Sequence, residues 1–289
     1  MRPMDTSIAR FTKGERPRPG SVIAPLLYLG HCPDVPYSYV GRPPPGVPAD
    51  GCEYVSRPVV IHDARDAAGF LDLDRNGFEL WHAPSSVHDF LDEEEVESWY
   101  VPELVELVLG ATGGRSAHVF DTQLRRREFG RPPMTLGGRS GPFAGPAGRV
   151  HVDYTEASGA RRYGKVLDSR PLPRRFAIVN VWRSIGAAPV LDTPLAVCDA
   201  RSVLPDDLVA TELRYPDRTG EISLVRHRPG HLWSYVSEMR RDEVLLFKQY
   251  DSEGGVARFV PHAAFDHPEM PPDAPPRQSI EARVLVTFA

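Results

Sequence analysis

The chain has 289 residues, a formal net charge of −5, and 41% hydrophobic against 25% charged residues, the composition of an ordinary globular protein. An acidic chain gives no electrostatic reason to expect nucleic acid or an anionic membrane as a partner, so we expect a small molecule. No apolar run approaches the length that spans a bilayer, and residues 1–20 lack the apolar core of a secretion signal. We therefore expect a cytoplasmic protein, as a monomer or homodimer.

The cysteine count argues against a disulfide framework or a zinc site. The three cysteines, Cys32, Cys52 and Cys198, are odd in number and far apart in the sequence. We expect them as buried apolar side chains. The 30 prolines limit long helices and favour many short strands joined by turns.

The first part of the chain has little regular pattern. Residues 1–24 are polar and rich in proline, and we expect an arm there, followed by a single domain over residues 25–289. The segment 39–51, YVGRPPPGVPADG, is predicted as a loop, and the segment 57–65, RPVVIHDAR, as a strand.

A helical region is predicted over about residues 85–112. Acidic residues crowd its first turns, Pro102 is placed to restart or kink it, and Gly110 is placed to end it. Leu104, Val105 and Val108 recur at helical spacing. One face of this helical region is therefore expected to pack against the rest of the protein.

From about residue 116 to residue 289 the pattern becomes a series of strands. Eight or nine segments follow one another with Pro, Gly and Asp turns between them: AHVFDTQLR, RVHVDYT, RFAIVNVWRSI, PLAVCDARSV, EISLVRHR, HLWSYV, EVLLFKQYDS, ARFVPHAAF and SIEARVLVTF. No helix-length segments separate them, as parallel sheets would require. The sequence predicts a mainly β fold, an antiparallel barrel or jelly roll, with the helical region covering one outer face in an α+β arrangement.

One strand and one late histidine suggest a metal site. His151 and Asp153 stand two apart in RVHVDYT, so both side chains leave an extended chain on the same face. Alone, this pair is a weak signal and favours an ordinary half-buried strand over a metal site. His262 ends a short apolar strand near the end of the series. Two histidines and one carboxylate leave open positions for a co-substrate and dioxygen, which is the Fe(II) site of non-haem oxygenases.

Two residues at the start of the last strand suit 2-oxoglutarate as that co-substrate. A planar arginine can hold its distal carboxylate through two parallel hydrogen bonds, and Arg277 lies fifteen residues after His262. Ser279 follows in RQS and offers a further hydroxyl. The joint pattern is far more specific than any of its parts.

These segments, together with HDARDAAGFLDLDRNGFEL, resemble a fungal and bacterial family that includes gibberellin desaturase-like and cephamycin 7α-hydroxylase-like proteins. The resemblance covers about residues 20–289. It implies a double-stranded β-helix (jelly-roll, cupin-like) core and dependence on Fe(II), 2-oxoglutarate and dioxygen. It also implies oxidation of a small natural product in secondary metabolism, by hydroxylation, desaturation or a related rearrangement.

Two assignments have competitors. His231, in RPGHLWSY, is the alternative to His262 as the third ligand, and Arg283 is the alternative to Arg277 for 2-oxoglutarate. Asn180 and Arg183 lie in the apolar strand VNVWRSI and are expected to mark a polar interior near the co-substrate, although Arg183 suits the barrel edge equally.

The substrate site is the least determined. Aromatic residues of the strands and of the following loop are candidates, although such residues equally suit a core: Tyr154, Trp182, Trp233 and Tyr250. The segment 154–163, YTEASGARRY, is expected as a loop at the barrel mouth. Two other functions fit the same pattern, a non-redox metal-dependent isomerase or cyclase, and a β-barrel binding protein without activity.

Overall fold

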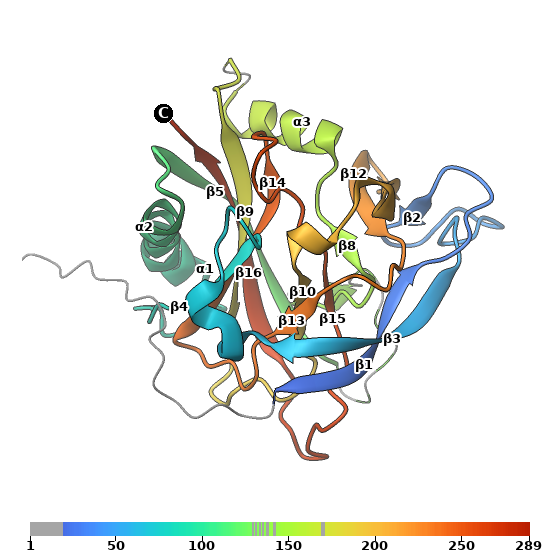
Figure 1. The fold of residues 1–289 in the computed structure, drawn as a ribbon, viewed down its shortest axis with the longest axis horizontal. Coiled ribbons are helices and arrows are strands. Elements are labelled where there is room, and N and C mark those ends of the chain that lie inside the picture. The colour runs from blue at the N-terminus through green and yellow to red at the C-terminus, as the bar shows by residue number, and fades with distance from the viewer. Residues whose placement is uncertain are drawn as a thin grey trace, which may run out of the picture.

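The computed structural model describes residues 20–289, except 129, 131, 133, 135, 137, 138, 141, 142, 169 and 170. Within this part of the chain, two curled β-sheets face each other (Figure 1). The larger has nine strands, in the order β1 (Ser21–Leu29), β3 (Tyr54–Asp63), β13 (Trp233–Tyr235), β10 (Leu195–Cys198), β15 (His262–Ala264), β8 (His151–Val152), β12 (Thr219–Val225), β11 (Leu208–Arg214) and β2 (Tyr37–Tyr39).

The second sheet has seven strands in the described residues, in the order β4 (Phe78–His82), β14 (Glu243–Asp251), β9 (Phe176–Ser184), β16 (Gln278–Thr287), β5 (Ser116–Arg126), β7 (Phe143–Ala144) and β6 (Arg139–Ser140). The helices are α1 (Glu93–Glu95), a π-helical turn (Val96–Tyr100), α2 (Val101–Thr112) and α3 (Glu156–Val166), with 3-10 turns at Ala64–Phe70, Ala200–Ser202 and Pro205–Asp207. None of these helices is both long and apolar enough to cross a membrane.

Strand β9 shows how the second sheet divides the core. All nine of its residues are buried. Val179 and Val181 face outward and pack with Leu104 and Val108 of α2, whereas Trp182 packs on the opposite side with side chains of both sheets. A strand that is covered on both faces reads as a continuous apolar run, which explains the sequence of β9.

The predicted fold class is confirmed, and most strand predictions are confirmed with it. Helix α2 covers the outer face of the second sheet, as Figure 1 shows at the left of the molecule. Pro102 begins this helix as expected, but the prediction that Gly110 ends it is wrong. The helix ends at Gly113, whose φ of 66° is the left-handed conformation that glycine adopts without steric cost.

Three further sequence predictions need correction. Residues 21–24 of the expected arm belong to strand β1, while residues 1–19 lie outside the described part of the chain. Cys32 and Cys52 form a disulfide, so only the buried Cys198 is the free apolar thiol that we expected of all three. The two half-cystines are 20 residues apart, and only the long loop between β1 and β3 brings them together.

The third correction concerns the segment after His151 and Asp153. It forms helix α3 instead of a loop, because Thr155 and Ser158 satisfy each other's backbone N–H groups in a capping box. The helix lies across one end of the two sheets (Figure 1). Gly159 faces the ring of Tyr250, and a methyl group at this position would overlap that ring.

The close approach of Gly159 to Tyr250 predicts opposite effects for two substitutions in one helix. Gly159→Ala should lower the free energy of unfolding by about 1–3 kcal/mol, since α3 must move off the sheets. Gly164→Ala, where a methyl group meets open space, should raise it by up to about 1 kcal/mol through helix propensity. Urea denaturation measures both, and equal effects of the two substitutions would contradict this packing.

Candidate metal centre

His151 and His262 are brought together by the pairing of two neighbouring strands. Strands β8 and β15 are antiparallel, and His262 lies directly opposite His151 in their register. The two ring centroids are 4.2 Å apart. Residues that are paired in this way present their side chains on the same face of a sheet. The structure therefore joins residues 111 positions apart into one cluster.

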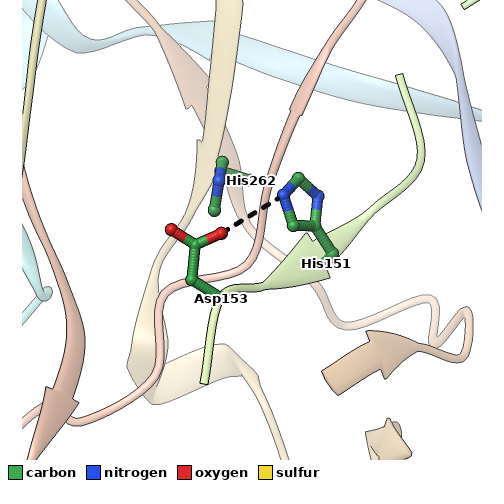
Figure 2. A group of neighbouring side chains, drawn as sticks. All are labelled: His151, Asp153 and His262. Carbon is green, nitrogen blue, oxygen red and sulfur yellow. Dashed lines mark ion pairs between the residues drawn. The ribbon is translucent and has the colours of Figure 1, made fainter. Parts of the chain in front are cut away.

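Asp153 completes the cluster one residue after β8 ends. Its Oδ1 lies 3.5 Å from Nε2 of His151, the interaction dashed in Figure 2. One ligand atom from each of His151, Asp153 and His262 can be chosen so that all lie within 4.8 Å of one another. All three side chains are largely buried. Within the described residues, this is the group of three or more potential metal-binding side chains that is found.

Hydrogen bonds to backbone carbonyl oxygens decide which nitrogen of each histidine ring is available to a metal. Nδ1 of His151 lies 2.7 Å from the carbonyl oxygen of Arg149 and donates to it. Nδ1 of His262 lies 3.4 Å from the carbonyl oxygen of Val260. A ring nitrogen that donates to a carbonyl cannot ligate a metal, so Nε2 is the nitrogen of each ring that is available to a metal.

The carboxylate of Asp153 is oriented from the opposite sheet. Its Oδ2 accepts hydrogen bonds from Nε of Arg283 at 2.8 Å and from Nδ2 of Asn180 at 2.9 Å. Its backbone N–H donates to Oε1 of Gln249 at 2.7 Å. Because Oδ2 is occupied, Oδ1 is the oxygen that faces the two histidines.

The electrostatics of the cluster favour the ligating forms. Burial alone would raise the pKa of the Asp153 carboxyl, but the Arg283 guanidinium and His151 hold this pKa well below its ordinary value. Burial and the neighbouring His151 lower the pKa of His262 to about 3. At neutral pH the cluster therefore offers a carboxylate and a neutral His262 imidazole, as a divalent metal requires.

A second buried group lies on the inner face of β16. Arg277 and Ser279 are two apart at the start of this strand, and both are buried. Nη1 of Arg277 donates to the carbonyl oxygen of Thr193 at 2.7 Å, and its guanidinium lies 5.5 Å from the ring centre of Trp182. Nε of Arg277, Oγ of Ser279 and Nε1 of Trp182 have no hydrogen-bond partner in the described residues.

These unpartnered donors fit the distal carboxylate of 2-oxoglutarate. Burial and the neighbouring guanidinium of Arg125 together lower the pKa of Arg277 to about 9. Arg125 is itself buried and donates to the carbonyl oxygen of Gly145. A buried cation with spare donors is stabilised when an anion binds it. The donor set is thus that of a carboxylate site.

The structure separates the two competing arginines. Arg283 directs Nε to Asp153, Nη1 to Asp121 and Nη2 to Glu281, the last at 3.0 Å. Its three nitrogens are thus engaged by carboxylates of the protein, whereas Arg277 keeps Nε unpartnered. The geometry favours Arg277 for the co-substrate.

Two other predicted residues lie away from the cluster. His231 is bonded through Nε2 to Asp207 at 3.0 Å and approaches the Tyr28 hydroxyl at 3.4 Å through Nδ1, so both ring nitrogens are engaged. The prediction of a polar interior is confirmed for Asn180, which faces Asp153, but is wrong for Arg183, because positions three apart on a strand face opposite sides. Arg183 lies on the outer face, where it donates to the carbonyl oxygens of Ala83 and Arg241.

The four predicted substrate residues are all buried in apolar clusters. Trp182 lies between the sheets, Trp233 packs against β1 and β3, and Tyr154 and Tyr250 pack together near α3. None of them lines the cavity of about 890 Å³, and neither does any of His151, Asp153 and His262. Its wall includes Thr155 at the start of α3, Phe259, and Leu208, Ala210 and Ser223 of β11 and β12.

The sequence analysis missed Gln249, Glu281 and Arg149. Gln249 and Arg149 bond Asp153 and His151 directly, and Glu281 bonds the two residues that hold Asp153. Gln249 and Glu281 are buried polar residues that follow apolar residues in β14 and β16, and this placement is the signal that was present in the sequence. Arg149 acts through its carbonyl, which no sequence pattern reveals.

Comparison with known proteins agrees with this site. Residues 26–287 match the family model described as an oxidoreductase/YMDC permease-like domain. The Fe(II)/2-oxoglutarate-dependent dioxygenase nvfI of Aspergillus novofumigatus is 34% identical over 258 residues, 86% of this chain and 89% of that protein. The hydroxylase/desaturase efuI of Hormonema carpetanum is 33% identical over 255 residues, 81% of this chain and 84% of that protein.

A solved structure is similar over nearly the whole chain. The iron and alpha-ketoglutarate-dependent endoperoxidase NvfI superposes with a TM-score of 0.81 and 31% sequence identity, covering 93% of this chain and 99% of that one. The fold of this chain is therefore the fold of that dioxygenase.

His262 lies in the metal cluster and His231 lies away from it, so their substitution should affect metal binding differently. His262→Ala should weaken the binding of Fe(II) or Co(II) at least about 100-fold, because one of three protein ligands is lost. His231→Ala should leave the affinity unchanged while lowering the free energy of unfolding by about 1–3 kcal/mol, since Asp207 loses a buried partner. Anaerobic calorimetric titration decides, and weaker metal binding by His231→Ala alone would overturn the assignment.

Proposed function

The chain belongs to the family of Fe(II)/2-oxoglutarate-dependent hydroxylases and desaturases of fungal secondary metabolism, and on this premise we propose that His151, Asp153 and His262 hold the iron. The enzyme is a 2-oxoglutarate-dependent non-haem iron dioxygenase that acts on a small-molecule natural product. The convergence of two Nε2 atoms and one Oδ1 atom, with Nδ1 and Oδ2 engaged elsewhere, carries the assignment of the ligands.

The protein contributes binding, orientation and exclusion of water. When bound, iron and 2-oxoglutarate supply the oxidising chemistry together with dioxygen. Arg277 and Ser279 hold the distal carboxylate of the co-substrate, with the Nε1 group of Trp182 beside them. Arg283 and Asn180 hold Asp153 so that a single carboxylate oxygen reaches the metal. Buried apolar side chains such as Phe247 and Val197 keep water from the remaining sides.

We propose the cavity lined by Thr155 and Phe259 as a binding space for part of the substrate, although the three proposed iron ligands do not themselves line it. Its volume of about 890 Å³ lies within the range of small-molecule sites. Most charged residues on its wall are paired, among them Glu156 with Arg258 at 2.6 Å and Arg201 with Asp199 at 2.7 Å. Apolar residues such as Phe259 and Leu208 make up much of the rest of the wall. This wall suits a substrate with a largely apolar skeleton.

Hydroxylation, desaturation and other oxidations by this family differ in how the substrate lies relative to the metal. A displacement of about an ångström is enough to change which hydrogen reacts. The residues that surround the metal cluster would set that position. The cytoplasmic location and the monomeric or homodimeric state stay predictions from the sequence.

The different roles of the two arginines predict two separate defects. Arg277→Gln should weaken 2-oxoglutarate binding by about 10- to 100-fold and leave Fe(II) affinity unchanged, since one arm of a charge-assisted pair is lost. Arg283→Gln should weaken Fe(II) binding instead, because Asp153 loses its cation. Anaerobic titration of the visible absorption band of the iron and 2-oxoglutarate complex separates the two. Weaker 2-oxoglutarate binding by Arg283→Gln, with normal binding by Arg277→Gln, would show that Arg283 holds the co-substrate.

The function itself is tested by the co-product. Purified enzyme with Fe(II) and oxygen should convert 2-oxoglutarate to succinate, slowly without substrate and faster with it. Succinate is measured by mass spectrometry, with Asp153→Asn as the matched inactive protein. A wild-type rate no higher than that of Asp153→Asn would contradict the proposed residues.

A further inference from the structure

Arg149 lies two residues before His151, and its side chain is held by a loop that is remote from the metal cluster in sequence. Nη1 and Nη2 of its guanidinium bond the two oxygens of Asp50 at 2.6 and 2.7 Å. Nη1 also bonds the hydroxyl of Tyr54 at 2.9 Å, and the guanidinium stacks on that ring at 3.9 Å. Such a bidentate, stacked arginine is fixed in position more firmly than a single hydrogen bond could fix it.

The loop that holds Arg149 is itself tied down. Asp50 also accepts a hydrogen bond from the hydroxyl of Ser38 at 2.6 Å. The disulfide between Cys32 and Cys52 closes the loop between β1 and β3 just beyond Asp50. Backbone hydrogen bonds of Gly30 and Glu53, at 2.8 and 2.9 Å, lie next to this disulfide. Asp50 is therefore a fixed anchor.

The backbone of Arg149 connects the anchored side chain to His151 of the metal cluster. Its carbonyl oxygen accepts the Nδ1 proton of His151, the bond that leaves Nε2 available for a metal. On the next residue, the N–H of Val150 donates to the carbonyl oxygen of Leu27 at 2.9 Å, so β1 holds the same segment. The orientation of the His151 ring thus depends on where the Arg149 peptide lies.

We propose that Arg149, clamped by Asp50 and Tyr54, is a positioning residue that sets the ring orientation of His151 and thereby the metal affinity of the enzyme. This inference rests on the proposed function, since it takes His151 as a ligand. The guanidinium touches neither metal nor substrate and acts through its own carbonyl. Loss of a group that accepts a hydrogen bond from the second nitrogen of a ligand histidine typically lowers metal affinity by about 10- to 100-fold.

The chain offers a matched control for this arginine. Arg214 bonds Glu212 through two nitrogens at 2.9 and 2.8 Å and stacks on Tyr37 at 4.0 Å. It belongs to the same nine-stranded sheet, but its carbonyl oxygen accepts from Val40 and contacts no metal ligand. Removing Arg214 therefore deletes a paired and stacked arginine, more exposed than Arg149, without touching His151.

The test uses the full chain loaded with Co(II) in place of iron. Arg149→Met should raise the Kd for Co(II) about tenfold, whereas Arg214→Met should leave it unchanged. Proton NMR of the Co(II) protein gives a second readout, because the Nδ1 protons of the two ligand histidines are exchangeable and strongly shifted. In Arg149→Met the His151 signal should move and exchange faster with water, while the His262 signal stays in place.

Several outcomes are decisive. If Arg149→Met does not fold, Asp50→Asn, which keeps the size of the anchor and removes its charge, should show the same two changes. An unchanged Kd and unchanged signals in a folded Arg149→Met protein would overturn the positioning role while leaving the proposed function intact. If the wild-type protein binds no Co(II), the proposed metal site itself is wrong.

Discussion

The contact between Asp153 and the pair Arg283 and Asn180 joins the two sheets at the centre of the molecule. The nine-stranded sheet and the turn after β8 supply all three candidate ligands, and the seven-stranded sheet supplies both groups that hold the carboxylate. A buried carboxylate without such partners would be strongly destabilising. The sheets must therefore face each other in this arrangement, and the same contact directs the free oxygen of Asp153 toward the two histidines.

The site could be predicted from sequence where it depends on local spacing. The two-residue interval between His151 and Asp153 fixes their common face, and the alternation within β9 and β16 predicts strands. His262 was predicted from its place before the last strand. Its pairing with His151 is a long-range contact that the sequence does not show. The roles of Arg277 and Arg283 stayed open, since only the facing of the sheets shows that Arg283 meets Asp153.

Other features depend on contacts that local patterns do not encode. Helix α3 contains two glycines and few apolar residues, and it is defined by its capping box and by the fit of Gly159 on Tyr250. Strand β1 lies next to a proline-rich segment and contains Pro25, yet its inward positions are apolar. The disulfide between Cys32 and Cys52 needs a loop closure that cysteine counting cannot reveal.

The most direct test of the account is a crystal structure of the enzyme with Fe(II) and 2-oxoglutarate, prepared without oxygen. We predict iron bound by Nε2 of His151, Nε2 of His262 and Oδ1 of Asp153, with Oδ2 still on Arg283 and Asn180. The distal carboxylate of 2-oxoglutarate should lie on Arg277 and Ser279. Iron ligated by His231, or a co-substrate carboxylate on Arg283, would contradict the account.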